Sequence, residues 1–290
     1  MKIINKVESE SVFFSVSKKL PDLLNNLNFN LDDRIIKSEW ENNRLNLREK
    51  LTYLDRNFLS NSGIAGLMFQ SDFDLANKEF NLIDKNLLSK IQEYDISKPE
   101  YVTQYGSFST NTIHHLFHIQ NFIDNREDVS PVESVLEWGG GYGNMCKLFF
   151  ETFDELKSFT IIDIPEFLII QYVFLSSYFG EKNVRIIKNM NEITNGINLI
   201  SVSDVINSEI SKFDLFISNW AISESTVFCQ EFADKNGIFD IKNQLISFHQ
   251  CGHHIPFMDE SMILNQRLKN KNFKIIPIEV IPGINYYAIK

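Results

Sequence analysis

The stretch Ser134–Asn144, with the sequence SVLEWGGGYGN, constrains the fold of this chain more than any other. An apolar run suited to a buried strand passes Glu137, enters a glycine-rich turn and continues into Met145–Glu151, which has helical character. Glycine adopts backbone dihedrals closed to other residues and lets a ligand approach the main chain closely. The free N–H groups at a helix start can then meet a polar ligand. The stretch therefore predicts a strand, a glycine turn and a helix, the layout of a nucleotide-type cofactor loop.

Two later segments repeat the pattern of a buried strand with a polar end. Phe159–Asp163 ends in an acid, one strand–helix–strand unit after Glu137, where an acid can accept hydrogen bonds from ribose hydroxyls. Phe213–Asn219 is a further buried strand that ends in a polar residue. Three such signals in the right order indicate a cofactor-binding α/β sheet far more specifically than one glycine turn.

From Val132 onward, strand-like and helical segments alternate. Two segments compete for the third strand, and periodicity does not choose between them. The final pair of strands is separated only by Ile-Pro-Gly and is predicted to form a hairpin. The predicted strands are Ser134–Trp138, Ser158–Asp163, one of Val184–Ile187 and Ile197–Val202, Phe213–Asn219, Gln244–His249, Phe273–Val280 and Ile284–Ile289, and the predicted helices are Asn144–Glu151, Glu166–Phe179, Ser225–Asp234 and Asp259–Asn270.

This order predicts an α/β fold with a Rossmann-like, seven-stranded sheet of the class I methyltransferase type that ends in a β-hairpin. Residues 1–125 are predicted to be a separate, mostly helical N-terminal region, and residues 126–290 the sheet domain. Within the first region, Asn111–Ile123 is predicted as a helix with Ser109 or Thr110 as its N-cap. The N-terminal helices are expected to form a lid over an acceptor site or a homodimer surface.

Composition narrows the partners and the compartment. The 290 residues carry a formal net charge of −10 and contain no basic run, which argues against a nucleic-acid partner. The longest apolar stretch, Phe167–Phe179, is interrupted by polar residues and too short to span a bilayer. The three cysteines are scattered without metal-ligand spacing, as expected for reduced thiols, and the sequence predicts a cytoplasmic protein.

The combined signature resembles the bacterial sugar O-methyltransferase family within the class I S-adenosylmethionine (SAM)-dependent methyltransferases. The resemblance rests on VLEWGGGYGN, IIDIPEFLIIQYVFLSSYFG, FDLFISNWAISES and the terminal IPGINYYAIK, and it covers roughly Val132–Lys290. It implies SAM as the cofactor and a hydroxyl of an activated sugar or glycan precursor as the acceptor. The glycine spacing is G-x-G-x-G rather than the G-x-G-x-x-G of a dinucleotide site, which disfavours a nicotinamide oxidoreductase.

The resemblance also implies roles for individual residues. The glycines would approach the methionine and ribose parts of SAM, and Glu137 would reach the amino group. Asp163 would hold the ribose hydroxyls, and the rival role for it is a cap on the helix that begins at Pro165–Glu166; the two roles can coexist. The implied cofactor residues are Glu137, Gly139, Gly140, Gly141, Tyr142, Gly143, Asp163, Ile164, Ser203, Asp204 and Asn219.

The base that would remove the acceptor's proton is not fixed by the resemblance. Distant small-molecule relatives place a histidine just after the fourth strand, where this chain has Ser223 followed by Glu224. The six histidines fall into a helical group, His114-His115-x-x-His118, and a group after the fifth strand, His249 with His253-His254. The second group is favoured because ligands bind at the carboxyl edge of such sheets. The candidate catalytic residues are therefore His249, His253, His114, His115 and Glu224, and no ligand set for a metal is recognised.

These observations predict a SAM-dependent O-methyltransferase. Two alternatives stay open, namely methylation of a phenol or other small metabolite and a catalytically inactive SAM-fold module for binding or assembly. Ser223 in place of a histidine gives the inactive alternative some weight.

Overall fold

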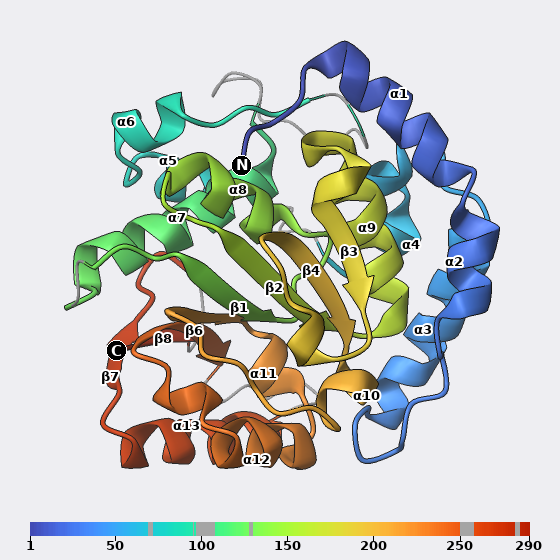
Figure 1. Ribbon diagram of the computed structural model, residues 1–290. Helices are drawn as coiled ribbons and strands as arrows, with labels where there is room; N and C mark the ends of the chain where they lie inside the picture. The colour runs from blue at the N-terminus through green and yellow to red at the C-terminus, as the bar shows by residue number, and fades with distance from the viewer. Residues whose placement is uncertain (69–71, 95, 97–107, 128–129, 250–257, 282–284) are drawn as a thin grey trace.

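The computed structural model describes residues 1–68, 72–94, 96, 108–127, 130–249, 258–281 and 285–290 (Figure 1). Across this part of the chain, one central sheet contains eight strands in the order β3-β4-β2-β1-β5-β6-β8-β7. The strands are β1 (Ser134–Trp138), β2 (Ser158–Asp163), β3 (Val184–Ile187), β4 (Gly196–Ser201), β5 (Leu215–Asn219), β6 (Asn243–His249), β7 (Lys274–Pro277) and β8 (Asn285–Ile289).

The predicted fold class is confirmed. Strands β1 to β6 pair in parallel, and β8 runs antiparallel to both β6 and β7, which gives a parallel sheet with a terminal antiparallel pair. The predicted count of seven strands is wrong by one, because both candidates for the third strand are strands. Gly196–Ser201 pairs with β2, and Val184–Ile187 adds an outer parallel strand to it. A short apolar run can form an edge strand as well as an inner strand. The pattern therefore did not show whether the two segments were alternatives for one strand or two separate strands.

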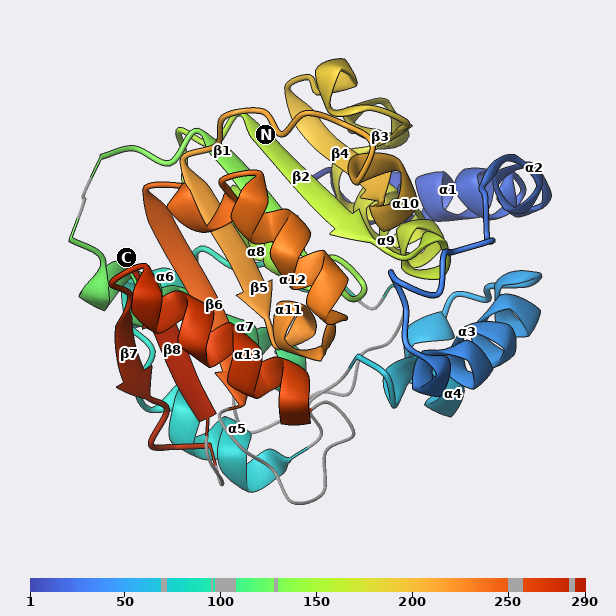
Figure 2. The same cartoon turned by 90° about the horizontal axis from the view of Figure 1, so that it is seen from below.

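Helices cover both faces of the sheet (Figures 1 and 2). One face is covered by α7 (Thr110–Asn125), α8 (Asn144–Thr152) and α9 (Pro165–Phe179). The other is covered by α11 (Ala221–Glu224), α12 (Val227–Lys235) and α13 (Met258–Asn270), while α10 (Val202–Val205) follows β4 directly. Two hydrophobic clusters, one on each side of the sheet, form the core.

Local sequence explains where the helices on the first face begin and end. The Ser109 side chain accepts a hydrogen bond from the Thr112 N–H at 3.1 Å and caps α7, as predicted. Helix α9 starts with Pro165, whose fixed φ suits the first helical position, and stops at Gly180, which has a φ of 81°. In the described residues, no helix is long and apolar enough to cross a membrane.

The N-terminal region is helical, as predicted. It contains α1 (Lys6–Ser17), α2 (Leu20–Asn26), α3 (Ser38–Leu51), α4 (Ser62–Ala65), α5 (Phe73–Phe80) and α6 (Lys85–Ser89), with a 3-10 turn at Phe58–Ser60. In the sheet domain, further 3-10 turns lie at Glu181–Asn183, Met190–Glu192 and Ile238–Asp240. Helices α1 and α3 pack against α9, at the rim of the sheet in Figure 1.

A buried ion cluster joins α3 to the first turn of α9. The Glu166 side chain is fully buried and accepts from Arg48 Nε at 2.6 Å and from Arg44 Nε at 3.3 Å. Arg44 is also buried and donates to the Phe29 carbonyl. Because Glu166 lies three residues after Asp163, the cluster ties the N-terminal helices to the edge of the sheet where the site lies.

Candidate functional site

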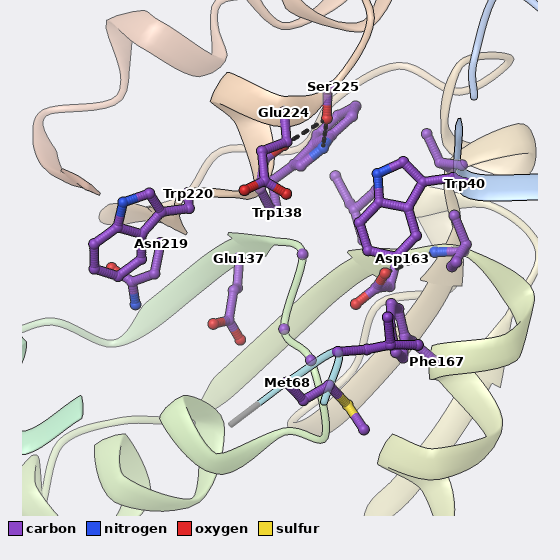
Figure 3. Close-up of a pocket in the computed structure, with 18 of the residues that line it drawn as sticks. Trp40, Met68, Glu137, Trp138, Asp163, Phe167, Asn219, Trp220, Glu224 and Ser225 are labelled. Atoms are coloured by element: carbon purple, nitrogen blue, oxygen red, sulfur yellow. Dashed lines mark hydrogen bonds between the residues drawn. The ribbon is translucent and has the colours of Figure 1, made fainter. Parts of the chain in front are cut away.

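A cavity of about 530 Å³ lies at the carboxyl edge of the parallel strands, where ligands bind in open α/β sheets. Figure 3 shows its two ends. Asp163, Phe167, Trp40 and Met68 gather at one end and Asn219 and Trp220 at the other, and Glu137, Glu224 and Trp138 lie between the two groups. We call these the Asp163 end and the Trp220 end.

The glycine turn forms the floor between the two ends. Gly139 has a φ of 77°, and a Cβ placed on it would lie 2.0 Å from the Ala221 Cβ. A Cβ on Gly140 would lie 2.7 Å from Ile161 Cγ2 and 3.0 Å from Glu137 Oε2. The turn therefore requires glycine at both positions, for backbone conformation at the first and for close packing at both.

Glu137, on β1, is a buried carboxyl group with an unused oxygen. The residue is 2% exposed, and its Oε2 atom has no hydrogen-bond partner. Burial, with the nearby Asp163 carboxylate as a second cause, raises the pKa of Glu137 to about 8. A buried acceptor that lines a cavity without a partner indicates a missing donor, and a cationic donor would also restore the charged form.

Asp163 lies at the end of β2 and has donors on both carboxylate oxygens. Oδ1 accepts from the Ile164 N–H at 2.8 Å and Oδ2 accepts from Gln171 Nε2 at 2.7 Å. Burial raises the pKa of Asp163 to about 7, against the lowering effect of these hydrogen bonds and of those from the turn. The alternative role as a helix cap is wrong, because α9 has no side-chain cap and its N-cap residue is Ile164.

The other predicted cofactor residues divide into two groups. Gly141, Tyr142, Ile164 and Asn219 line the cavity together with Glu137, Asp163, Gly139 and Gly140. The described lining of the cavity does not contain Gly143, Ser203 or Asp204, and the segment after β4 contributes Val202 to it. Gly143 is instead the N-cap residue of α8, and the Asp204 carboxylate faces Lys188 at 3.9 Å. The segment after β4 therefore reaches the cavity through Val202 rather than through Ser203 or Asp204.

The N-terminal region supplies lining residues that the sequence did not predict. Trp40 on α3 and Phe167 on α9 meet edge to face, with ring centroids 6.3 Å apart, at the Asp163 end. Met68 lines the same end, and Lys37 lines the cavity while its ammonium group lies 2.5 Å from the Glu260 carboxylate on α13. Nothing in the local pattern of a polar helix marks one tryptophan as a cavity residue, because its position depends on docking against α9.

Glu224 and His249, two of the residues predicted as the catalytic base, line the cavity near Trp220. Glu224 is half-buried, and burial raises the pKa of its carboxyl group to about 7. His249 ends β6; burial lowers its pKa, and a hydrogen bond with Asn285 opposes that shift. Ser223 is buried and donates to the Trp220 carbonyl at 2.6 Å, which fixes the turn after β5. His253 lies outside the described residues.

The two candidates on α7, His114 and His115, also line the cavity. His115 Nδ1 lies 3.2 Å from Asn144 Nδ2, and burial together with the neighbouring His114 lowers the pKa of His115 to about 3. Both nitrogens of His114 have partners, Glu79 at 2.6 Å and His118 at 3.0 Å. The structure thus brings four of the five candidate catalytic residues to one cavity.

Comparison with known proteins gave matches only among solved structures. No family model and no curated protein matches the chain. A methyltransferase from Podospora anserina, PaMTH1, bound to S-adenosylhomocysteine (SAH), is similar with 10% identity over 82% of this chain and 98% of its own, at a TM-score of 0.40. A SAM-dependent methyltransferase from Aquifex aeolicus is similar with 13% identity over 74% and 97%, at a TM-score of 0.38. A ribosomal protein L11 methylase from Lactobacillus delbrueckii subsp. bulgaricus is similar with 15% identity over 69% and 89%, at a TM-score of 0.39.

Proposed function

We propose that this chain is a SAM-dependent methyltransferase that methylates a hydroxyl group of a small acceptor. The observation that carries the proposal is the pair of buried carboxyl groups, Glu137 and Asp163, beside a glycine turn at the carboxyl edge of a parallel sheet (Figure 3). The unused oxygen of Glu137 matches a cationic amino group, and the carboxylate of Asp163 matches a ribose diol. SAM carries both groups.

The Asp163 end supports the placement of the adenosine part of the cofactor. Ile164, Phe167 and Trp40 offer apolar and aromatic surfaces to a purine ring next to the carboxylate that would hold the ribose. When bound, SAM supplies a methyl group on a sulfonium cation for in-line transfer, so the task of the protein is alignment and proton removal.

The Trp220 end is proposed to bind the acceptor, a hydroxyl of an activated sugar or a glycan precursor. An indole face such as that of Trp220 can cover the apolar C–H face of a sugar ring, and the amides of Asn219 and Asn285 can bond to its hydroxyls. Glu224 is the proposed base. A pKa of about 7 lets a carboxylate form and accept a proton near neutral pH, which is the most effective range for a general base. His249 is the second candidate, because burial keeps its imidazole neutral.

Calorimetry with SAH, followed by transfer of a labelled methyl group from SAM, tests the proposal. The acceptor panel contains methyl glycosides, UDP-glucose and catechol. We expect SAH binding in the micromolar range typical of enzyme ligands and methyl transfer to a sugar hydroxyl. Absence of SAH binding would reject the cofactor, and transfer only to catechol would replace the sugar with a phenol. SAH binding without transfer to any compound of the panel would favour the inactive binding module.

A further inference from the structure

A chain of buried polar side chains lies behind the Trp220 end of the cavity. It joins Glu79 on α5, His114 and His118 on α7, and Tyr287 on β8, all of them buried. Glu79 Oε1 lies 2.6 Å from His114 Nδ1, His114 Nε2 lies 3.0 Å from His118 Nε2, and His118 Nδ1 is hydrogen-bonded to the Tyr287 hydroxyl. Three segments far apart in the sequence therefore meet through one continuous set of hydrogen bonds.

This series of hydrogen-bonded side chains leaves His114 without a free ring nitrogen. Glu79 Oε1 lies against the Nδ1 atom of His114, and His118 lies against its Nε2 atom, where one of the two Nε2 atoms donates and the other accepts. Burial lowers the pKa of His118 well below its usual value and raises the pKa of the Tyr287 phenol well above its own, so both groups stay uncharged. His114 lines the cavity but, in this arrangement, is not placed to take a proton from an acceptor.

The ring of His114 is held flat against Trp220 instead. The imidazole and indole rings are stacked, with centroids 5.5 Å apart and planes at 16°. His118 meets the same indole at 5.3 Å and 64°. Trp220 itself has a φ of 61°, an uncommon conformation for a residue with a side chain. Its indole N–H donates to Asn285 Oδ1 at 3.2 Å.

We propose that Glu79, His118 and Tyr287 are positioning residues that hold His114 against Trp220 and thereby fix the acceptor wall of the cavity. The inference rests on the proposed function for the assignment of the Trp220 end to the acceptor. A wall residue with a strained backbone keeps one orientation only where its surroundings determine it, and the buried chain supplies that constraint from behind. Removal of a distant member should then disturb acceptor binding while the cofactor end is unchanged.

The substitution Tyr287→Phe tests this at the far end of the chain. It removes one oxygen from a residue outside the described cavity lining and keeps the ring that packs in the core. The matched control is Tyr286→Phe, because Tyr286 is the preceding residue of β8 and packs on the opposite face of the sheet, against Phe248. Both variants, and the wild type, are prepared with 5-fluorotryptophan, and the ¹⁹F signal of Trp220 is assigned with Trp220→Phe.

We expect Tyr287→Phe to move the Trp220 signal and to leave those of Trp40 and Trp138 in place, while Tyr286→Phe moves none of them. With the best acceptor of the panel, the KM for the acceptor should rise about threefold to thirtyfold, with the SAH dissociation constant unchanged. Glu79→Gln, which keeps the size of the side chain, should act in the same direction on both measurements.

Two results would overturn the inference. One is a Trp220 signal that behaves the same in Tyr287→Phe and in the control. The other is a loss of kcat of a hundredfold or more in Glu79→Gln at constant KM that recovers at high pH, because this would make His114 the base. If the wild type binds no SAH, the proposed function fails, but the ¹⁹F comparison still decides whether the chain positions Trp220.

Discussion

Binding of SAH should weaken strongly as the pH falls from 8 to 6, and Glu137 should cause most of the change. In the ligand-free protein the pKa of Glu137 is raised to about 8, so at pH 6 nearly all molecules carry the neutral carboxyl group. A cationic amino group binds the carboxylate, which means that the proton must leave on binding. If the bound group returns to its usual pKa, the affinity at pH 6 is about fiftyfold lower than at pH 8, or about 2.3 kcal/mol.

The substitution Glu137→Gln removes this contribution. The variant should bind SAH more weakly at pH 8, and it should lose most of the dependence on pH. The remaining change in SAH affinity between pH 6 and pH 8, about tenfold or less, is expected from Asp163, whose pKa is raised to about 7. Calorimetry at pH 6, 7 and 8 in two buffers of different ionisation enthalpy measures both the affinity and the number of protons released. The matched control is Glu133→Gln, because Glu133 forms an exposed ion pair with Lys157.

The sign of the effect is fixed by the raised pKa. The folded, ligand-free protein binds more protons than the unfolded chain between the usual carboxyl pKa and about pH 8, so its stability falls as the pH rises through that window. Ligand affinity changes in the opposite direction. Equal SAH affinities at pH 6 and pH 8 in the wild type would refute the assignment, as would an unchanged pH dependence in Glu137→Gln.

Four further substitutions test the rest of the site. Gly139→Ala should abolish SAH binding, because the new Cβ would lie 2.0 Å from the Ala221 Cβ. Gly141→Ala should still bind SAH measurably, because no atom of the described residues packed around its Cβ is closer than 3.8 Å. Equal SAH affinities of the two variants would contradict the packing argument. Asp163→Ala should weaken SAM and SAH alike by roughly 1.5–3 kcal/mol, measured by calorimetry, and an effect on only one ligand would exclude a ribose contact. Glu224→Gln should reduce kcat about a hundredfold or more with little change in SAH affinity, and the wild-type rate should rise with pH through about 7; a variant with normal turnover would transfer the role to His249.

The sheet could be predicted from the sequence because its signals are local. The run that ends at Glu137, the strand that ends at Asp163 and the Pro165 start of α9 each follow from a few neighbouring residues, and the structure has all three. The same signals indicated Val184–Ile187 as a candidate strand, but they did not predict that it would add an edge strand beside β4. Its four residues form a strand only because β4 offers an unpaired edge, which is a property of the assembled sheet.

The residues that line the cavity were harder to predict, because tertiary packing decides which side chains reach it. Glu79 is an ordinary acid on a short helix in the sequence, yet it is fully buried against His114. Trp40 reaches the Asp163 end through the docking of α3 on α9. Neither position has a local signature, since a helix presents a residue to whatever lies beside it. Asp204 lies outside the described lining of the cavity for the same reason, because the turn after β4 places Val202 there.

The ion cluster of Arg44, Arg48 and Glu166 limits how a ligand can enter. Swinging α3 away as a rigid unit would leave a fully buried carboxylate without its two guanidinium partners. Breaking a buried pair costs about 3–5 kcal/mol, so such an open state would occupy fewer than about one molecule in a hundred. Lys37, the N-cap residue of α3, forms a second ion pair with Glu260 on α13, and both of these side chains are only 15% exposed. Helix α3 is therefore held both to α9 and to α13, and we expect it to stay in place when a ligand enters the cavity.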